Sequence, residues 1–254
     1  MYIDFRKRFM FLVLSLLINA TGHALTISTN LGSAVWTASA VNINNCFSIN
    51  SLSLVIFLEG LAVNCLVSLI DKKRKISKFL LDLLFITPFS ILVQYFTSCL
   101  EGLNLQHQLL LIRIILDILG IVFISLATSL YQRANIVLHP NDDFMQTIRF
   151  MFLHGDATKA QIIHFLVPLS IIVITTVISH AIWAVGIGTI ISFFFQGSMI
   201  KWFDIHAFKH LKHYDIGCII FRTDNVKFFC ITVLLLFSPF LRQNKRDGPQ
   251  RQSN

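Results

Sequence analysis

Three ionisable residues lie inside long apolar stretches of the sequence. Arg113 and Asp117 are four positions apart, so on a helix they share one face, and Glu59 lies in a separate stretch. Charged side chains in an apolar span are costly and commonly mark an ion or proton pathway. One interpretation is therefore a proton or ion site formed by Glu59 with Arg113 and Asp117. The other is a structural network, in which Arg113 neutralises one acid and joins two segments.

Further polar side chains lie within the same apolar stretches. Such groups either contribute to a site or form hydrogen bonds between helices. Those considered for the candidate site are Asn19, His23 and His180, and Asn64 is a further example. Asp82 lies close to Lys78 at the end of a stretch, where we expect its carboxylate to reach water.

Glycines mark one connection between apolar stretches. Gly186 and Gly188 flank Ile187 and precede Thr189, and Gly197 follows. No lysine of a phosphate-binding loop follows them, so we predict a tight helix turn at which backbones approach closely. The functional alternative is a broken helix lining a cavity.

The composition is that of a membrane protein. Of 254 residues, 55% are hydrophobic and 13% are charged, against about 25% charged in soluble domains. The net charge is +8, but the basic residues cluster beside apolar stretches, so we expect a lipid bilayer and not nucleic acid as the partner. The five cysteines are scattered and form no pair typical of a disulfide framework or a zinc site.

The sequence lacks the short motifs of hydrolases, metalloproteases and nucleotide-driven pumps. His206, His210 and His213 have a spacing that could hold a metal, but Lys209 and Lys212 between them would repel a cation. We therefore expect no catalytic residues, no bound metal and no cofactor, and we expect that the protein is not an enzyme.

Six stretches have about the length and apolarity needed to cross a bilayer as helices. They cover residues 9–29, 52–70, 79–100, 109–131, 162–181 and 183–200. Lysine and arginine occur in alternate connections only, which predicts that both termini are cytoplasmic. The alternative for residues 9–29 is a cleaved signal peptide, but the apolar run continues past a normal cleavage position.

Two further segments have helical signals. Residues 140–155 open with Pro140 and close with Gly155, which predicts a short amphipathic helix with Phe144, Ile148, Met151 and Phe152 on one face. Thr158 and Gln161 form a capping-box pattern at the start of the next span. Residues 204–254 are expected to form a cytoplasmic or interfacial segment and tail, in which the apolar run 228–241 is short for a span.

An internal repeat is indicated by two similar stretches. Leu25–Trp36 and Leu130–Asn141 each follow an apolar span and place an asparagine before an aliphatic residue, 105 positions apart. Because three spans separate the copies, the copies would insert in opposite orientations. This predicts a 3+3 inverted repeat, an arrangement common in secondary transporters.

The stretch from Gly22 through Asn30-Leu31-Gly32 to Trp36, the loop 139–143, and Gly186–Thr189 with Gly197 resemble the YczE/YitT-type family of small bacterial membrane proteins. The resemblance covers residues 8–203. It implies a multi-pass plasma-membrane protein; some members are labelled permease-like, and the family's activity is not established. The sequence departs from the expected repeat near residues 79–100, where it has no glycine motif.

Together these features predict an all-α polytopic bundle of about six spans in the plasma membrane. The expected function is a permease-like carrier or channel for a small solute. The alternative is a non-transporting membrane protein that assembles with or regulates another complex.

Overall fold

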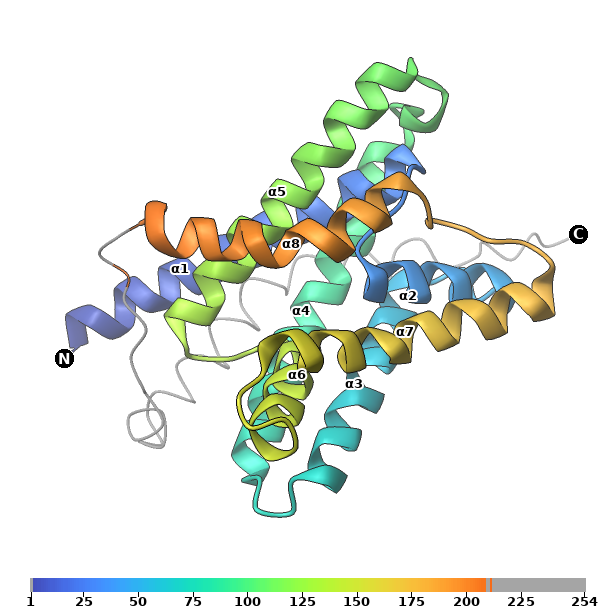
Figure 1. The fold of residues 1–254 in the computed structure, drawn as a ribbon. Helices are drawn as coiled ribbons and strands as arrows, with labels where there is room; N and C mark the ends of the chain where they lie inside the picture. The colour runs from blue at the N-terminus through green and yellow to red at the C-terminus, as the bar shows by residue number, and fades with distance from the viewer. Residues whose placement is uncertain (1, 209–210, 212–254) are drawn as a thin grey trace, which may run out of the picture. The chain divides into compact units, whose positions relative to one another are not determined.

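The structure is a computed structural model that describes residues 2–208 and residue 211 of the chain. The described part is helical, without strands, so the predicted fold class is confirmed (Figure 1). The helices are α1 (Tyr2–Thr29), α2 (Val35–Cys46), α3 (Leu52–Ile70), α4 (Ile76–Glu101), α5 (Leu110–Ala134), α6 (Pro140–Met151), α7 (Ala157–Ser179) and α8 (Ile187–His206), with a short 3-10 turn at Leu105–His107. The predicted segment 228–241 lies outside the described residues.

Five helices of the described part are long and apolar enough to cross a membrane: α1, α3, α4, α5 and α7. They correspond to the first five predicted spans. The sixth, predicted at 183–200, is displaced: residues 180–186 connect α7 to α8, and α8 begins at Ile187. No stretch of α8 is as apolar as those of the five candidate spans, because Gln196, Lys201 and Asp204 lower its hydropathy. A crossing by this sixth segment stays a prediction.

Helix α8 nevertheless runs beside α5 in the same direction. Gly188, at its start, packs against the carboxylate of Asp117, and Asp204, near its end, accepts a hydrogen bond of 2.6 Å from Oγ of Ser129. Beyond the helix, the carbonyl of Ala207 accepts a 2.7 Å bond from Arg133. Helix α8 therefore extends along most of the length of a candidate spanning helix.

The central contact of the fold is an antiparallel pair formed by α1 and α5. Small residues allow the two backbones to approach: a Cβ atom at Gly22 would lie 2.7 Å from the carbonyl oxygen of Gly120. Each helix also carries an arginine that reaches the end of the other. Arg8 donates to the carbonyl of Arg133 at 2.7 Å, and Arg113 donates to that of Thr29 at 2.9 Å. These bonds satisfy carbonyl groups that the helix ends leave unpaired.

The eight helices form two halves of matching design, α1–α4 and α5–α8. Each half has one long helix, one helix of 12 residues and two further long helices. The packing matches as well, because α1 contacts α4 as α5 contacts α8, and α2 contacts α7 as α6 contacts α3. Asn30 and Asn135, the pair noted in the sequence, both adopt left-handed backbone conformations with φ of 52° and 49°. The two halves are inverted relative to each other, since α1 and α5 are antiparallel.

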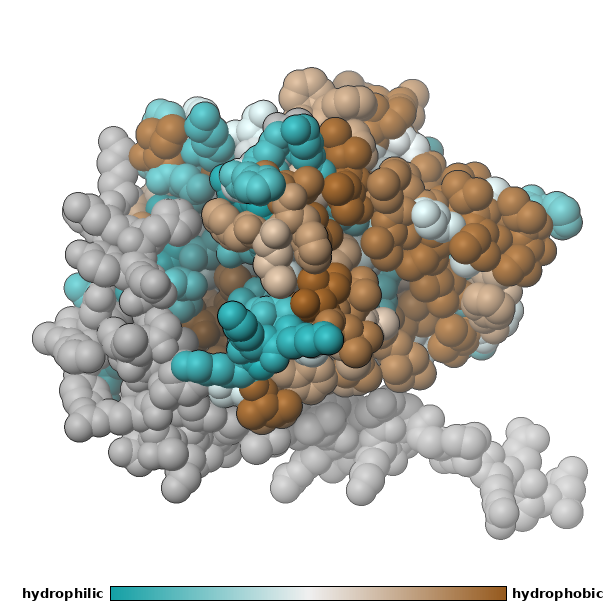
Figure 2. Space-filling view, turned by 60° about the horizontal axis from the view of Figure 1, so that its bottom comes forward, coloured by the Kyte–Doolittle hydropathy of each residue, from teal (hydrophilic) through white to brown (hydrophobic). Residues whose placement is uncertain are grey.

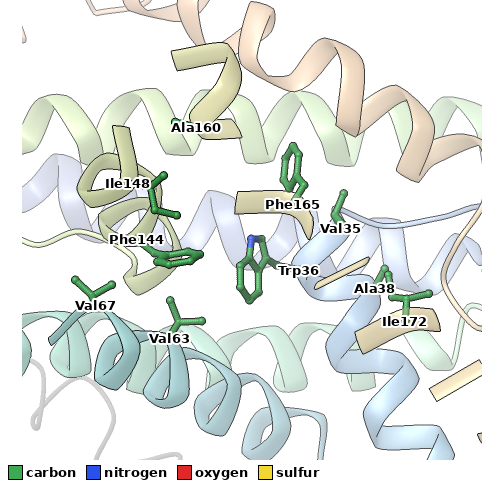
Figure 3. Packing of buried hydrophobic residues seen from close by; sticks show 10 residues of the cluster. All are labelled: Val35, Trp36, Ala38, Val63, Val67, Phe144, Ile148, Ala160, Phe165 and Ile172. Atoms are coloured by element: carbon green, nitrogen blue, oxygen red, sulfur yellow. The ribbon is translucent and has the colours of Figure 1, made fainter. Parts of the chain in front are cut away.

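The short helix α2 was not expected, because residues 30–51 were interpreted as a connection. Its residues from Val35 to Asn42 are buried. A hydrophobic cluster forms around α2 and its counterpart α6, with α3 and α7 packed on both (Figure 3). Trp36 of α2 lies between Phe144 of α6 and Phe165 of α7 in this cluster. The short helices thus fill the space between the halves.

Helix α6 confirms the predicted short helix, and its start and surroundings are now defined. The Nδ1 atom of His139 caps it by accepting from the N–H of Asn141 at 3.2 Å. Phe144 and Ile148 are buried, while Met151 and Phe152 are exposed, so only the first two turns are inserted between other helices. The predicted capping role of Thr158 was wrong, because α7 begins earlier and Asp156 is its N-cap.

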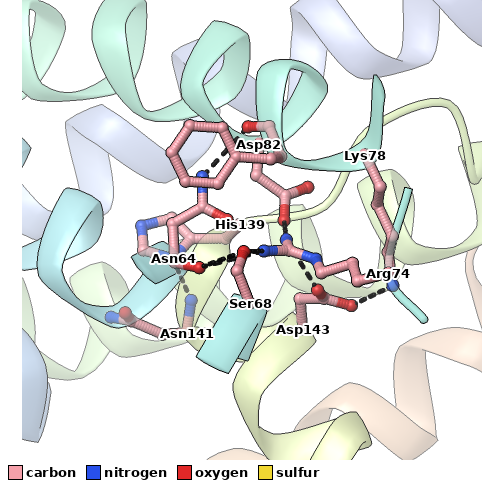
Figure 4. A network of polar contacts seen from close by, with 9 residues as sticks. Asn64, Ser68, Arg74, Lys78, Asp82, His139, Asn141 and Asp143 are labelled. Atoms are coloured by element: carbon pink, nitrogen blue, oxygen red, sulfur yellow. Dashed lines mark hydrogen bonds and ion pairs between the residues drawn. The ribbon is translucent and has the colours of Figure 1, made fainter. Parts of the chain in front are cut away.

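An ionic network joins the α3–α4 connection to α6 (Figure 4). Arg74 pairs with Asp82 of α4 and, at 2.9 Å, with Asp143 of α6, and Lys78 also pairs with Asp143. Asp82 is 1% exposed, so the prediction that its carboxylate reaches water was wrong. A buried carboxylate needs such a partner, and the arginine supplies it to both acids at once.

Hydrophobic side chains cover much of the exposed surface, as the broad brown face of Figure 2 shows. Such a surface is unfavourable in water and suits contact with lipid chains. Exposed examples on the spanning helices are Leu111, Ile115, Ile118, Leu166, Val173, Ile174, Val177 and Ile178. This surface and the five long apolar helices indicate a multi-pass membrane protein.

The close contact at the start of α8 gives a prediction. A methyl group added at Gly188 would overlap Oδ2 of Asp117 and lie 2.6 Å from the carbonyl oxygen of Gly32. We expect Gly188→Ala to lower the unfolding free energy by about 1–3 kcal/mol, the usual cost of overpacking. Gly197→Ala on the same helix is the control, because its nearest neighbour would be 3.4 Å away. Thermal unfolding in detergent measures both, and equal melting temperatures for the two variants would contradict the contact.

Candidate functional site

A cavity of about 560 Å³ lies between the two halves of the described chain, and all eight α-helices contribute to its wall. Its polar lining includes Asn19, His23, Trp36, Glu59, Tyr131, His139, Asn141, Asp142 and His164. Concave sites of this size, with apolar walls and a few polar groups, are typical of small-molecule binding. We therefore take this cavity as the candidate functional site.

The cavity extends between α7 and α8. In the first half α3 packs closely on α4, whereas the equivalent helices α7 and α8 share no extensive contact. Residues of both helices line the cavity, and Lys201 and Ser198 of α8 are exposed lining residues. The two halves therefore differ in the contact between their last two helices, and the cavity is open on the side where α7 and α8 do not pack together.

Glu59 lies on α3 and lines the cavity wall. Its carboxylate accepts a short hydrogen bond from the hydroxyl of Ser39 on α2. Among the described residues, no lysine, arginine or histidine nitrogen lies within ion-pair distance of Glu59. A carboxylate held only by a hydroxyl group in an apolar surrounding can interact favourably with a proton or with a cation that enters the cavity.

Two histidines of the cavity are held by side chains of α2. Nε2 of His164 accepts a 2.8 Å hydrogen bond from the indole N–H of Trp36. Nδ1 of His23 lies 2.7 Å from the hydroxyl of Thr37. In this arrangement Nε2 of His164 carries no proton, since it serves as an acceptor. His164 occupies the position equivalent to Glu59, 105 residues later in the sequence.

His139 and Asp142 lie in the α5–α6 connection and the first turn of α6, outside the candidate spans. Burial lowers the pKa of His139 to about 3, with the neighbouring His23 and His164 adding to the effect. His139 is therefore neutral near pH 7, as its role as the cap acceptor of α6 requires. Burial raises the pKa of Asp142 to about 6; the hydrogen bond from the Tyr131 hydroxyl opposes the shift and Asp143 adds to it.

Two buried amide oxygens of the cavity residues have no hydrogen-bond partner. They are Oδ1 of Asn19, whose residue is 3% exposed, and Oδ1 of Asn141, whose residue is 8% exposed. An unpaired buried acceptor is costly, and native proteins normally satisfy it with water or a ligand. Both residues line the cavity, but these two oxygens are themselves enclosed in the packing around it.

The structure does not bring Glu59 together with Arg113 and Asp117. Asp117 accepts a 3.0 Å bond from the Thr29 hydroxyl, and its other oxygen packs against Gly188. The carboxylate of Asp117 therefore lies at the start of α8, where the helix dipole favours a negative charge. Arg113 binds the carbonyl of Thr29, as described above. These two residues therefore join α1, α5 and α8, away from the cavity.

The other predicted residues have different positions. Asn19 and His23 line the cavity. His180 does not: it is exposed and ends α7 in a left-handed conformation with φ of 53°. Gly186 and Gly188 lie at the predicted turn, where the N–H of Gly188 donates to the carbonyl of Leu31 at 3.1 Å. Gly197 is not at a turn; it lies within α8 and lines the cavity.

Several cavity residues were not predicted from the sequence. Trp36 lines the cavity and belongs to α2, a helix that the sequence analysis did not predict, as does Ser39, which donates to the lining residue Glu59. Asp142 belongs to the predicted amphipathic helix. His164 was overlooked although the repeat offset relates it to Glu59. Comparing polar residues 105 positions apart would have pointed to this pair.

Fold and site together define a multi-pass helical membrane protein with an internal polar cavity between two inverted halves. The chain belongs to a family of unknown function, DUF6198, whose model matches residues 6–205. The resemblance to the YczE/YitT-type family is not confirmed by this match. No curated protein and no solved structure matches the chain.

The raised pKa of Asp142 predicts a pH-dependent stability. The folded protein binds the proton of Asp142 more tightly than the unfolded chain does. Ionisation of this carboxyl group therefore lowers the free energy of unfolding, and the loss grows as pH rises from about 4 through 6. Asp142→Asn removes the charge and keeps an oxygen that can accept from Tyr131. The melting temperature of Asp142→Asn, relative to the native protein, should therefore be higher at pH 7.5 than at pH 4.5. A difference independent of pH would contradict this assignment.

Proposed function

We propose that this protein is a carrier for a small solute in the plasma membrane, not an enzyme, and that both termini are cytoplasmic. The observation that supports the proposal most directly is the polar cavity between two inverted halves. Secondary transporters commonly place their substrate site at such a repeat interface. The basic residues 72–75 in the α3–α4 connection support a cytoplasmic position for that end.

Different contacts between the halves would close the two ends of the cavity. At the basic end, Arg74 and Lys78 pair with Asp143 of the other half. At the opposite end, the side-chain amide of Asn42 exchanges two bonds with the backbone of Trp183, of 2.6 and 3.0 Å. A carrier needs two such closures that open in turn while the solute site stays between them.

The carrier proposal predicts that the two closures control access from opposite sides. Thr128, which lines the cavity, can be changed to cysteine in a background whose native cysteines are replaced by alanine. Asp143→Asn should then increase labelling by a membrane-impermeant thiol reagent added at the basic end. Asn42→Ala should increase labelling from the other end. The measurement is the labelling rate in oriented vesicles.

Lys72→Gln is the matched control, because Lys72 is an exposed residue of the same connection as Arg74. It should leave both labelling rates unchanged. Unchanged rates in Asp143→Asn and Asn42→Ala, with both variants folded by size-exclusion chromatography, would contradict a carrier. That result would favour the alternative of a membrane protein that assembles with another complex.

A further inference from the structure

We propose that the cavity binds a small organic cation, an ammonium compound, in competition with protons. This inference rests on the proposed carrier function and adds its substrate class and coupling. It begins from the charges of the cavity wall, whose carboxylates Glu59 and Asp142 receive hydrogen bonds from hydroxyl groups only. Among described residues, neither carboxylate has a cationic side chain within ion-pair distance.

Several other acids of the described chain are paired with cationic side chains. Asp82 and Asp143 share Arg74, and Asp143 also pairs with Lys78. Asp117 also accepts from a hydroxyl, that of Thr29, but it lies away from the cavity at the start of α8, where the helix dipole favours its charge. Asp204, the third acid of the cavity lining, pairs with Arg133 at 3.5 Å. Of the three acids that line the cavity, Glu59 and Asp142 are thus the two without a cationic partner among the described residues.

The basic residues of the lining do not neutralise these acids. Arg149 donates to the carbonyl of Gly155 at 2.8 Å and stacks over Phe150, 5.1 Å from the ring centre. Lys201 is an exposed residue of α8. His139 and His164 each accept a hydrogen bond at one ring nitrogen, as neutral imidazoles do, and His23 lies against Thr37.

The remaining features of the wall also suit an ammonium compound. The cavity lining is also rich in aromatic side chains, whose ring faces attract cations. The aromatic lining residues are Trp36, Phe89, Tyr131, Phe165, Phe193 and Phe194.

The competition with protons follows from the same carboxylates. When the cavity is empty of cation, a proton on Glu59 or Asp142 removes the uncompensated charge. An entering ammonium ion supplies the positive charge instead, and the proton leaves to water, so that one positive charge replaces another. Binding of the cation should therefore strengthen as pH rises through about 6, where Asp142 ionises. Tyr131 and Asp143 are the groups that act on Asp142, and Ser39 donates to Glu59.

The test uses probes of one shape and three charges. Choline, its neutral isostere 3,3-dimethyl-1-butanol and the anionic isostere 3,3-dimethylbutanoate are compared by calorimetric titration of the purified protein. Tetramethylammonium and benzyltrimethylammonium, each with its neutral carbon isostere, extend the size range. At least one cation should bind more tightly than its isosteres, and its binding should weaken by about tenfold or more from pH 8 to pH 5.

Glu59→Gln should weaken that binding by about tenfold, and the control Glu101→Gln, at an exposed acid at the end of α4, should leave it unchanged. Folding of each variant is checked by its melting temperature without ligand. Preference for a neutral or anionic isostere, absence of binding by all three cations, or equal affinity in Glu59→Gln would overturn the inference. The thiol-labelling result at Thr128 would be unaffected, so failure of the substrate class is distinguishable from failure of the carrier function.

Discussion

The antiparallel contact between α1 and α5 is the constraint on which the other features depend. Gly22 and Gly120 let the two backbones approach so closely that no side chain fits between them. In an apolar solvent, van der Waals contact and hydrogen bonds hold helices together, so close approach stabilises such a pair. Arg8 and Arg113, which are 105 positions apart in the sequence, then bind the terminal carbonyls of the opposite helix. The same interaction is made twice, once at each end, which is what an inverted repeat requires.

Function is expected where the two halves differ. Glu59 and His164 are equivalent in the repeat but have different chemistry, one a carboxylate facing Ser39 and the other an imidazole facing Trp36. The two ends of the cavity are likewise closed by an ionic network and by an amide–backbone pair. A symmetric scaffold with unequal ends can favour one open state over the other, because the two closures break at different cost.

Much of this fold could be predicted from the sequence, because long apolar runs identify spanning helices and the asparagines 30 and 135 revealed the repeat. The site was harder. Glu59 and Asp117 were grouped because both are acids within apolar runs, but α3 and α5 make no extensive contact, and sequence periodicity carries no information on which helices adjoin. Helix α2 was missed because it is short and its stability comes from burial between the halves, not from an amphipathic pattern. Its residues Trp36 and Ser39 were missed with it.

The most direct test of the inverted architecture is the side of the membrane on which equivalent connections lie. Single cysteines at Ser48 and His154, in the α2–α3 and α6–α7 connections, form one equivalent pair of exposed positions. Lys73 and Val185, in the α3–α4 and α7–α8 connections, form the other. Each cysteine is introduced into a variant of the protein whose native cysteines are replaced, and the variant is expressed in intact cells. A membrane-impermeant thiol reagent should label the cysteines at positions 48 and 185. It should label those at positions 73 and 154 only after the cells are permeabilised. Labelling of both members of either pair from the same side would contradict two inverted halves.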